Sequence, residues 1–137
     1  MMDRSQAQKE SRGRILVIDD DPLLREFLVD FLQGAGFEVR PAPDGPTALS
    51  FFSAERFDLI FTDFRMPGMT GLEVAAAVRK TNPIIPIILV TGEVAVLEPK
   101  ALVQAGISRM LPKPFTLDEV RSCLDLMRAF MPHRRVA

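Results

Sequence analysis

Residues 15–28 read ILVIDDDPLLREFL, and the order of apolar and acidic residues in this stretch indicates the type of fold. Its first four residues are apolar, which is typical of a strand covered on both faces of a sheet. Three aspartates follow. Asp21 stands where a helix takes its N-terminal cap, and Pro22 stands at the first helical position, which favours proline. Apolar residues then recur at helical spacing as far as Leu32. The stretch therefore predicts a strand, an acidic turn and an amphipathic helix.

The same alternation of apolar runs and helical patterns continues along the chain. Strands are predicted at residues 15–18, 37–40, 57–62, 84–90 and 108–111. Helices are predicted at residues 22–34, 44–52, 72–80, 98–104 and 117–127. Five strands in strict alternation with five helices indicate an α/β fold, in which helices cover both faces of a parallel sheet.

Three local features refine these boundaries. Pro86 falls near the beginning of the fourth strand, where a missing N–H group does least harm. Pro99 is expected in the first turn of the fourth helix, so that regular helix begins near residue 98. Thr116 and Glu119 have the spacing of a capping box for the last helix, whose predicted apolar stripe is Leu117, Val120, Leu124 and Met127.

Composition limits the classes of protein to consider. The chain has 137 residues, of which 47% are hydrophobic and 26% charged, enough for one globular domain. No apolar run approaches the ~20 residues of a membrane span. The single cysteine, Cys123, and the single histidine, His133, argue against a disulfide framework, a cysteine-rich zinc site and a Ser-His-Asp triad. We expect a cytoplasmic protein.

Charge is distributed unevenly between the ends and the body of the chain. Residues 15–127 hold 10 basic and 16 acidic residues, and this excess of acid disfavours direct binding of nucleic acid by the domain. We expect a flexible extension at residues 1–13, one folded domain at 14–131 and a short tail at 132–137. No output module is recognisable after the domain, so the chain is predicted to be either a single-domain protein or part of a larger one.

Polar side chains follow four of the five predicted strands. Asp19 and Asp20 follow the first strand, Asp63 the third, Thr91 the fourth and Lys113 the fifth. The second strand offers only a proline. Because the carboxyl ends of parallel strands share one edge of a sheet, these groups are expected to converge there.

The converging groups suggest phosphoryl chemistry. Carboxylate oxygens suit Mg²⁺, an ammonium group and a hydroxyl can hold a phosphoryl group, and an aspartate can itself become phosphorylated. Taken singly, Asp63 could be a turn residue and Lys113 a solvated lysine. Their joint occurrence with Asp19, Asp20 and Thr91 favours a functional site.

At these positions the chain resembles the receiver domains of two-component response regulators, over about residues 14–131. The resemblance rests on ILVIDDDPLLREFL at 15–28, DLIFTDFRMPGMTGLE at 58–73, IILVTGE at 87–93 and AGISRMLPKPF at 105–115, and on their order and spacing. It implies a flavodoxin-like (βα)5 three-layer sandwich with a five-stranded parallel sheet in the order 2-1-3-4-5. It also implies a signalling domain rather than a conventional enzyme.

The resemblance assigns roles to individual residues. Asp63 matches the phosphoacceptor, and Thr91 and Lys113 match the residues that bind the phosphoryl group. The Mg²⁺ ligands of the family match Asp20 and Asp63, the backbone carbonyl of Arg65 and, through water, Asp19. The implied partners are a histidine kinase or a histidine phosphotransfer protein and a downstream protein target. A homodimer through the fourth helix, fifth strand and fifth helix is also possible.

Two departures from the family pattern bear on function. Met110 stands where the family often has a tyrosine or phenylalanine coupled to the threonine, and a methionine has neither ring nor hydroxyl. Arg65 and Glu93 lie two residues after Asp63 and Thr91. Their side chains are predicted either to flank the phosphoryl group or to pair with one another over it, and so to tune water access and the phosphoryl lifetime. The alternative is that they are two solvated charges.

Three other functions remain as alternatives. A phosphorylation-independent adaptor on the same fold stays open, because Met110 replaces the aromatic residue that the family often has. A haloacid-dehalogenase-like phosphatase fits poorly, because Asp63 is followed by Phe64 and Arg65 without the usual second acid. A flavodoxin-like cofactor carrier lacks a phosphate-binding loop after the first strand, where three aspartates would repel a flavin phosphate.

Overall fold

The computed structural model describes residues 11–129. The predicted tail at 132–137 and most of the predicted extension at 1–13 therefore lie outside the described residues. The strands are β1 (Arg14–Ile18), β2 (Glu38–Ala42), β3 (Leu59–Asp63), β4 (Ile87–Thr91) and β5 (Arg109–Pro112). The helices are α2 (Pro22–Gly34), α3 (Gly45–Ala54), α4 (Gly71–Arg79), α5 (Pro99–Ala105) and α6 (Leu117–Ala129), with a short 3₁₀ helix η1 (Val94–Val96).

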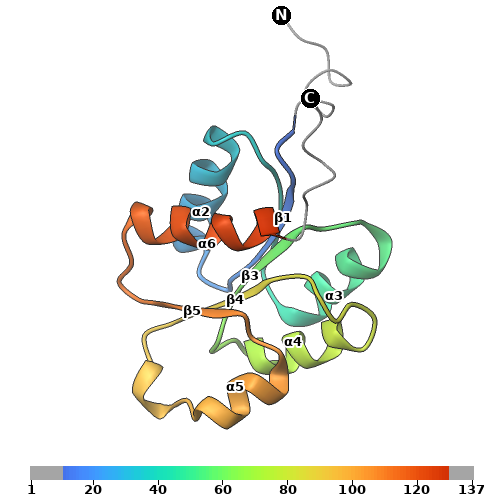
Figure 1. Ribbon diagram of the computed structural model, residues 1–137, viewed down its shortest axis with the longest axis vertical. Coiled ribbons are helices and arrows are strands. Elements are labelled where there is room, and N and C mark those ends of the chain that lie inside the picture. Colours follow the sequence, from blue (N-terminus) through green and yellow to red (C-terminus); the bar gives the residue numbers. More distant parts are fainter. Residues whose placement is uncertain (1–10, 130–137) are drawn as a thin grey trace, which may run out of the picture.

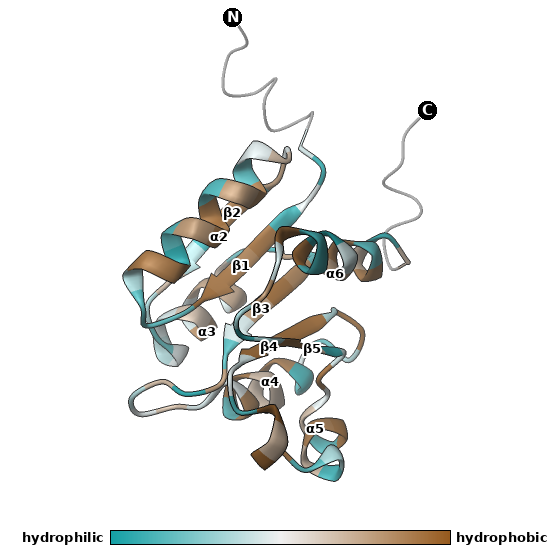
Figure 2. Cartoon of the chain, turned by 90° about the vertical axis from the view of Figure 1, so that its left-hand side faces the viewer, coloured by the Kyte–Doolittle hydropathy of each residue, from teal (hydrophilic) through white to brown (hydrophobic). Residues whose placement is uncertain are grey.

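The strands form one parallel sheet in the order β2-β1-β3-β4-β5, which confirms the predicted topology. Helices α2 and α6 cover one face, and α3, α4 and α5 cover the other (Figure 1). Successive residues of β1 alternate between the two cores. Ile15 and Val17 pack toward α2 and α6, whereas Leu16 and Ile18 pack toward α3 and α4. Figure 2 shows the apolar central strands between these two layers.

The helices begin where the sequence places capping groups. The Asp21 carboxylate accepts hydrogen bonds from the amides of Leu23 and Leu24, with Pro22 in the first turn of α2. Thr116 and Glu119 form the predicted capping box of α6, each side chain accepting the other residue's amide hydrogen. The first residues of α2 and α6 are therefore fixed by capping side chains that lie next to them in the sequence.

The fourth strand begins later than predicted, at Ile87 rather than at residue 84. The Asn82 side chain accepts the amides of Ile84 and Ile85 and holds this stretch in a turn, and Ile84 is 62% exposed. Pro86 consequently precedes the strand instead of lying inside it. Pro41 lies within β2, although this strand was predicted to end at residue 40. Among the strands of residues 11–129, β2 pairs with β1 alone, and such an edge strand tolerates a proline.

The two C-terminal helices confirm one detail and correct another. Pro99 lies in the first turn of α5 as predicted, while the Glu98 side chain makes no capping hydrogen bond there. Leu117 does not complete the apolar stripe of α6, since it is 36% exposed, and the fully buried Cys123 packs with Val120 in the core. Over residues 11–129, no helix combines the length and hydropathy needed to cross a membrane.

Candidate functional site

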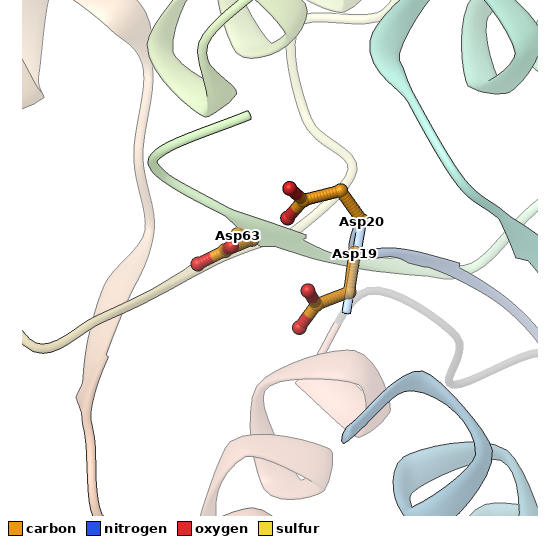
Figure 3. A group of neighbouring side chains, drawn as sticks. All are labelled: Asp19, Asp20 and Asp63. Carbon is orange, nitrogen blue, oxygen red and sulfur yellow. The ribbon is translucent and has the colours of Figure 1, made fainter. Parts of the chain in front are cut away.

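Three carboxylates gather at the carboxyl edge of the sheet. Asp19 and Asp20 follow β1, and Asp63 is the last residue of β3. One oxygen from each of them lies within 4.8 Å of the others (Figure 3). Asp19 and Asp63 are buried, with 2% and 7% exposure, whereas Asp20 is exposed. The cluster therefore has a buried floor and one carboxylate open to solvent.

The register of the sheet brings these residues together. Ile18 of β1 pairs with Thr62 of β3, so that the next residues along the two strands, Asp19 and Asp63, emerge side by side. The Asp19 carboxylate also accepts the amide of Asp21, and the Arg25 guanidinium donates to the Asp19 backbone carbonyl. These contacts hold the acidic turn in place.

Burial makes the cluster electrostatically unfavourable without a cation. Desolvation raises the pKa of Asp19 from 3.8 to about 6, and the charges of Asp63 and Asp20 push it in the same direction. Desolvation also raises the pKa of Asp63, against the opposing hydrogen bond from Lys113. Three clustered oxygen donors with this excess of negative charge fit a hard divalent cation.

Lys113 and a backbone amide hold one oxygen of Asp63. Lys113 Nζ and the amide of Phe64 each lie 3.0 Å from Asp63 Oδ1. Within residues 11–129 the other oxygen, Oδ2, accepts no hydrogen bond. Lys113 reaches this point from the end of β5, where its own amide donates to the Thr91 carbonyl at 2.8 Å, and the following Lys113–Pro114 bond is cis. Asp63 thus presents one anchored oxygen and one free oxygen.

Thr91 ends β4 and is buried, with 2% exposure. Its Oγ1 accepts the amide of Glu93 at 2.9 Å. The Thr91 hydroxyl donates no hydrogen bond to any residue between 11 and 129, so its proton is available to a ligand. The backbone carbonyl of Arg65 likewise accepts no backbone hydrogen bond from the described part of the chain.

Arg65 and Glu93 form a two-pronged ion pair across the loops that follow β3 and β4. Arg65 Nε lies 2.5 Å from Glu93 Oε2, and Nη2 lies 3.1 Å from Oε1. Each partner keeps the other charged, since the ion pair raises the pKa of Arg65 and lowers that of Glu93. Met110 lies on β5 opposite Leu89 and is half-buried.

Gly71 is a residue of the site that the sequence analysis did not single out. A Cβ atom at this first residue of α4 would lie 2.2 Å from the backbone oxygen of Asp63 and 2.8 Å from a Leu89 side-chain carbon. Glycine therefore lets α4 begin directly against the end of β3. The available signal was the glycine that follows the helix cap Thr70.

A family model described as the response regulator receiver domain matches residues 15–125. The chain belongs to this family. The resemblance stated from the sequence is thereby confirmed, and the family is one of signalling domains rather than of conventional enzymes. The cytoplasmic setting and the absence of nucleic-acid binding stay predictions.

Curated relatives of this chain are named response regulators. The response regulator MprA of Mycolicibacterium vanbaalenii and that of Mycobacterium avium are each 41% identical to this chain over 118 residues. These matches cover 86% of this chain and 50% of each relative, so the chain spans about half the length of the curated relatives it matches.

Solved structures support the fold. The chemotaxis response regulator CheY4 of Vibrio cholerae has a TM-score of 0.78 and 33% identity, with 84% of this chain and 98% of that chain covered. The response regulator TrrA of Thermotoga maritima, solved in complex with Mg²⁺-BeF, has a TM-score of 0.76 and 35% identity, with 83% and 97% covered. The flavodoxin-like receiver fold predicted from the sequence is confirmed.

Proposed function

We propose that this chain is the phosphoacceptor of a two-component phosphorelay and receives a phosphoryl group on Asp63. The donor is the phosphohistidine of a histidine kinase or of a histidine phosphotransfer protein. The observation that carries the proposal is the state of Asp63, which is anchored through Oδ1 by Lys113 and keeps Oδ2 free beside two further carboxylates. Membership of the receiver family supports it.

The transfer is a direct displacement at phosphorus. A bond forms between the free oxygen of Asp63 and phosphorus as the phosphorus–nitrogen bond of the donor breaks, and the electron pair of that bond stays on the imidazole nitrogen. Lys113 offsets charge on the phosphoryl oxygens, and the Thr91 hydroxyl donates to one of them. These groups act by position and charge on the carboxylate form of Asp63, which is the form that attacks phosphorus.

Mg²⁺ is the proposed cofactor. Asp19, Asp20, Asp63 and the Arg65 carbonyl would hold it. When bound, Mg²⁺ offsets the charge of the phosphoryl oxygens. The oxygen-only donor set within 4.8 Å supports this choice, as does the Mg²⁺-BeF complex of the related TrrA.

The output of the proposed switch is a change in protein contacts. Phosphorylation adds about −1.5 to −2 charges beside Thr91 and Lys113, which shifts the population of conformers on the surface between them. Val94, Val96 and Val103 expose apolar side chains in this region, with 40%, 64% and 76% exposure. We place the contact with a downstream protein, or with a second copy of the chain, on the face formed by α5, β5 and α6.

Arg65 and Glu93 are proposed to tune the lifetime of the phosphoryl group, because their ion pair spans the loops next to Asp63 and Thr91. Exchanging either residue for alanine is expected to change the rate of dephosphorylation. Unchanged lifetimes in both variants would show that the pair has no effect on the phosphoryl group.

We take residues 14–131 as the extent of the receiver domain.

A phosphorylation-independent adaptor is the second candidate, and Met110 is the observation that favours it. In this function the fold presents the same face to a partner without a phosphoryl signal. The two candidates differ in whether Asp63 is modified, which one experiment separates.

The test is the intact mass of the protein after incubation with Mg²⁺ and acetyl phosphate. Wild type is expected to gain one phosphoryl group in a Mg²⁺-dependent way, and Asp63→Asn is expected to gain none. Asp30→Asn, which changes an exposed carboxylate on α2, serves as the matched control and should behave as wild type. A wild-type protein that binds Mg²⁺ but forms no adduct with acetyl phosphate or a histidine phosphodonor contradicts the proposed function and favours the adaptor.

A further inference from the structure

The segment from Glu93 to Gly106, called here the 93–106 segment, is held near each end by an arginine side chain from another part of the fold. Of residues 94–104, none is buried. At the far end, the Arg79 guanidinium donates two hydrogen bonds, of 3.1 and 2.6 Å, to the Gly106 carbonyl. The near end is held by the Arg65–Glu93 ion pair. The helix within this segment has no side-chain cap at Glu98, so the ion pair is the side-chain contact that holds the near end.

Glu93 connects this fastening to the phosphoryl site. Its side chain pairs with Arg65, and its amide donates to Thr91 Oγ1 at 2.9 Å. Arg65 is two residues beyond Asp63, and its guanidinium lies 5.1 Å from the centre of the Phe64 ring. Glu93 thus joins the start of the 93–106 segment both to Thr91 and to the loop that follows Asp63.

We infer that Arg65 and Glu93 form a latch that is closed in the unphosphorylated chain and opens when the phosphoryl group on Asp63 takes Arg65 from Glu93. This inference rests on the proposed phosphorylation of Asp63. A phosphoryl group offers the guanidinium three strong acceptor oxygens and more charge than one carboxylate. The same charge repels the Glu93 carboxylate. Attraction of Arg65 and repulsion of Glu93 both favour opening of the ion pair.

The Arg65–Glu93 ion pair is exposed to solvent, and this exposure makes it easy to break. Arg65 and Glu93 side chains are 67% and 38% exposed, and exposed ion pairs stabilise proteins only weakly. A dianion on Asp63, two residues before Arg65, therefore has only a weak ion pair to displace. Release of Glu93 frees the start of the 93–106 segment, which carries the exposed Val94 and Val96. The latch would link phosphorylation to this surface without the aromatic residue that the family often has at the position of Met110.

The chain offers a clean reporter for this motion because it contains no tryptophan and no tyrosine. A Val96→Trp substitution at a 64% exposed position provides a single fluorophore within the 93–106 segment. Hydrogen exchange of the Val96 amide, which donates to the Glu93 carbonyl at 3.1 Å, reports opening of the same turn. Both signals are read with and without Mg²⁺ and acetyl phosphate, and intact mass is recorded on each sample.

Phosphorylation of the wild-type background is expected to shift the emission and to speed Val96 exchange about two- to fivefold, the scale of a weak exposed pair. Glu93→Gln and Arg65→Gln are each expected to show that faster exchange without phosphorylation, and to respond little to it. Exchanging the charges, by Arg65→Glu together with Glu93→Arg, should restore the closed baseline. Asp118→Asn breaks an exposed pair with Arg121 elsewhere and should behave as wild type.

Two results overturn the latch. In the first, the phosphoryl adduct forms and the Glu93→Gln and Arg65→Gln proteins keep the wild-type baseline and the full response. In the second, the charge exchange fails to restore the closed baseline, which would make the effect of the single variants a loss of packing. Absence of the adduct in wild type is a different failure, since it removes the proposed function and the latch with it.

Discussion

Removing the most buried carboxylate of the cluster should stabilise the metal-free protein. The pKa of Asp19 is raised from 3.8 to about 6, and each unit corresponds to 1.36 kcal/mol, so the ionised Asp19 costs about 3 kcal/mol of folding free energy at pH 7. Asparagine carries no charge but keeps an oxygen that can accept the Asp21 amide. The Asp19→Asn protein is therefore expected to be more stable than wild type by about 1–3 kcal/mol at pH 7.

The pH dependence of this gain follows from the direction of the shift. A raised pKa in the folded state gives stability that is complete below pH 3.8 and is lost as the pH rises through about 6. The advantage of Asp19→Asn over wild type should thus be near zero at pH 4, grow between pH 4 and 6, and level off at higher pH. Comparing the two proteins at each pH cancels the other titrating groups.

The assay is urea unfolding followed by circular dichroism from pH 4 to 8 in the presence of a chelator. Asp20→Asn is the comparison variant, because Asp20 belongs to the same cluster but is exposed, and its gain should be smaller. Adding Mg²⁺ should stabilise wild type more than Asp19→Asn. Equal stability of Asp19→Asn and wild type at pH 7, or an advantage of the same size at pH 4, would contradict the cost assigned to the buried Asp19 charge.

Further predictions concern the surroundings of the cluster. Gly71→Ala should destabilise the protein by about 2–4 kcal/mol in urea unfolding, because its methyl group would meet the Asp63 backbone oxygen at 2.2 Å. Gly34→Ala, with no atom within 4 Å of the new methyl group, should leave stability equal or raise it by up to about 1 kcal/mol. Lys113→Met should cost about 1–3 kcal/mol, since it strips the buried Asp63 of its cation, and an unchanged unfolding midpoint would contradict this. Cys123 should resist a thiol reagent until the protein unfolds, because burial blocks access and raises the pKa of the thiol, whereas rapid native labelling would contradict its burial.

The acidic residues of the site could be predicted from the sequence, whereas the packing around them could not. Asp19, Asp20 and Asp63 follow strands whose apolar runs are unmistakable, and parallel strands bring their carboxyl ends to one edge whatever the details of packing. Gly71 was not singled out, because its importance lies in the close approach of α4 to the Asp63 backbone. A contact between elements distant in the chain leaves no periodic signal.

Two predictions from the hydrophobic pattern were wrong, the start of the fourth strand and the apolar stripe of the last helix. The apolar character of Ile84 suggested a longer fourth strand, but the Asn82 side chain takes the amides that a strand would have used. Leu117 has the spacing of the apolar stripe of α6, yet as the first residue of that helix it lies half in solvent. Neither outcome follows from hydrophobic periodicity alone.

The alternation of strands and helices, the capping of α2 and α6 and the residue types available for phosphoryl chemistry can all be predicted from the sequence, because each depends on neighbours within a few positions. Which charged side chains form ion pairs depends on the three-dimensional fold. The Arg65–Glu93 pair could equally have been two solvated groups, and its formation depends on two loops, 28 residues apart, that the sheet register sets side by side. Charge pairing acts over a few ångströms, and that spacing is set by the packed fold.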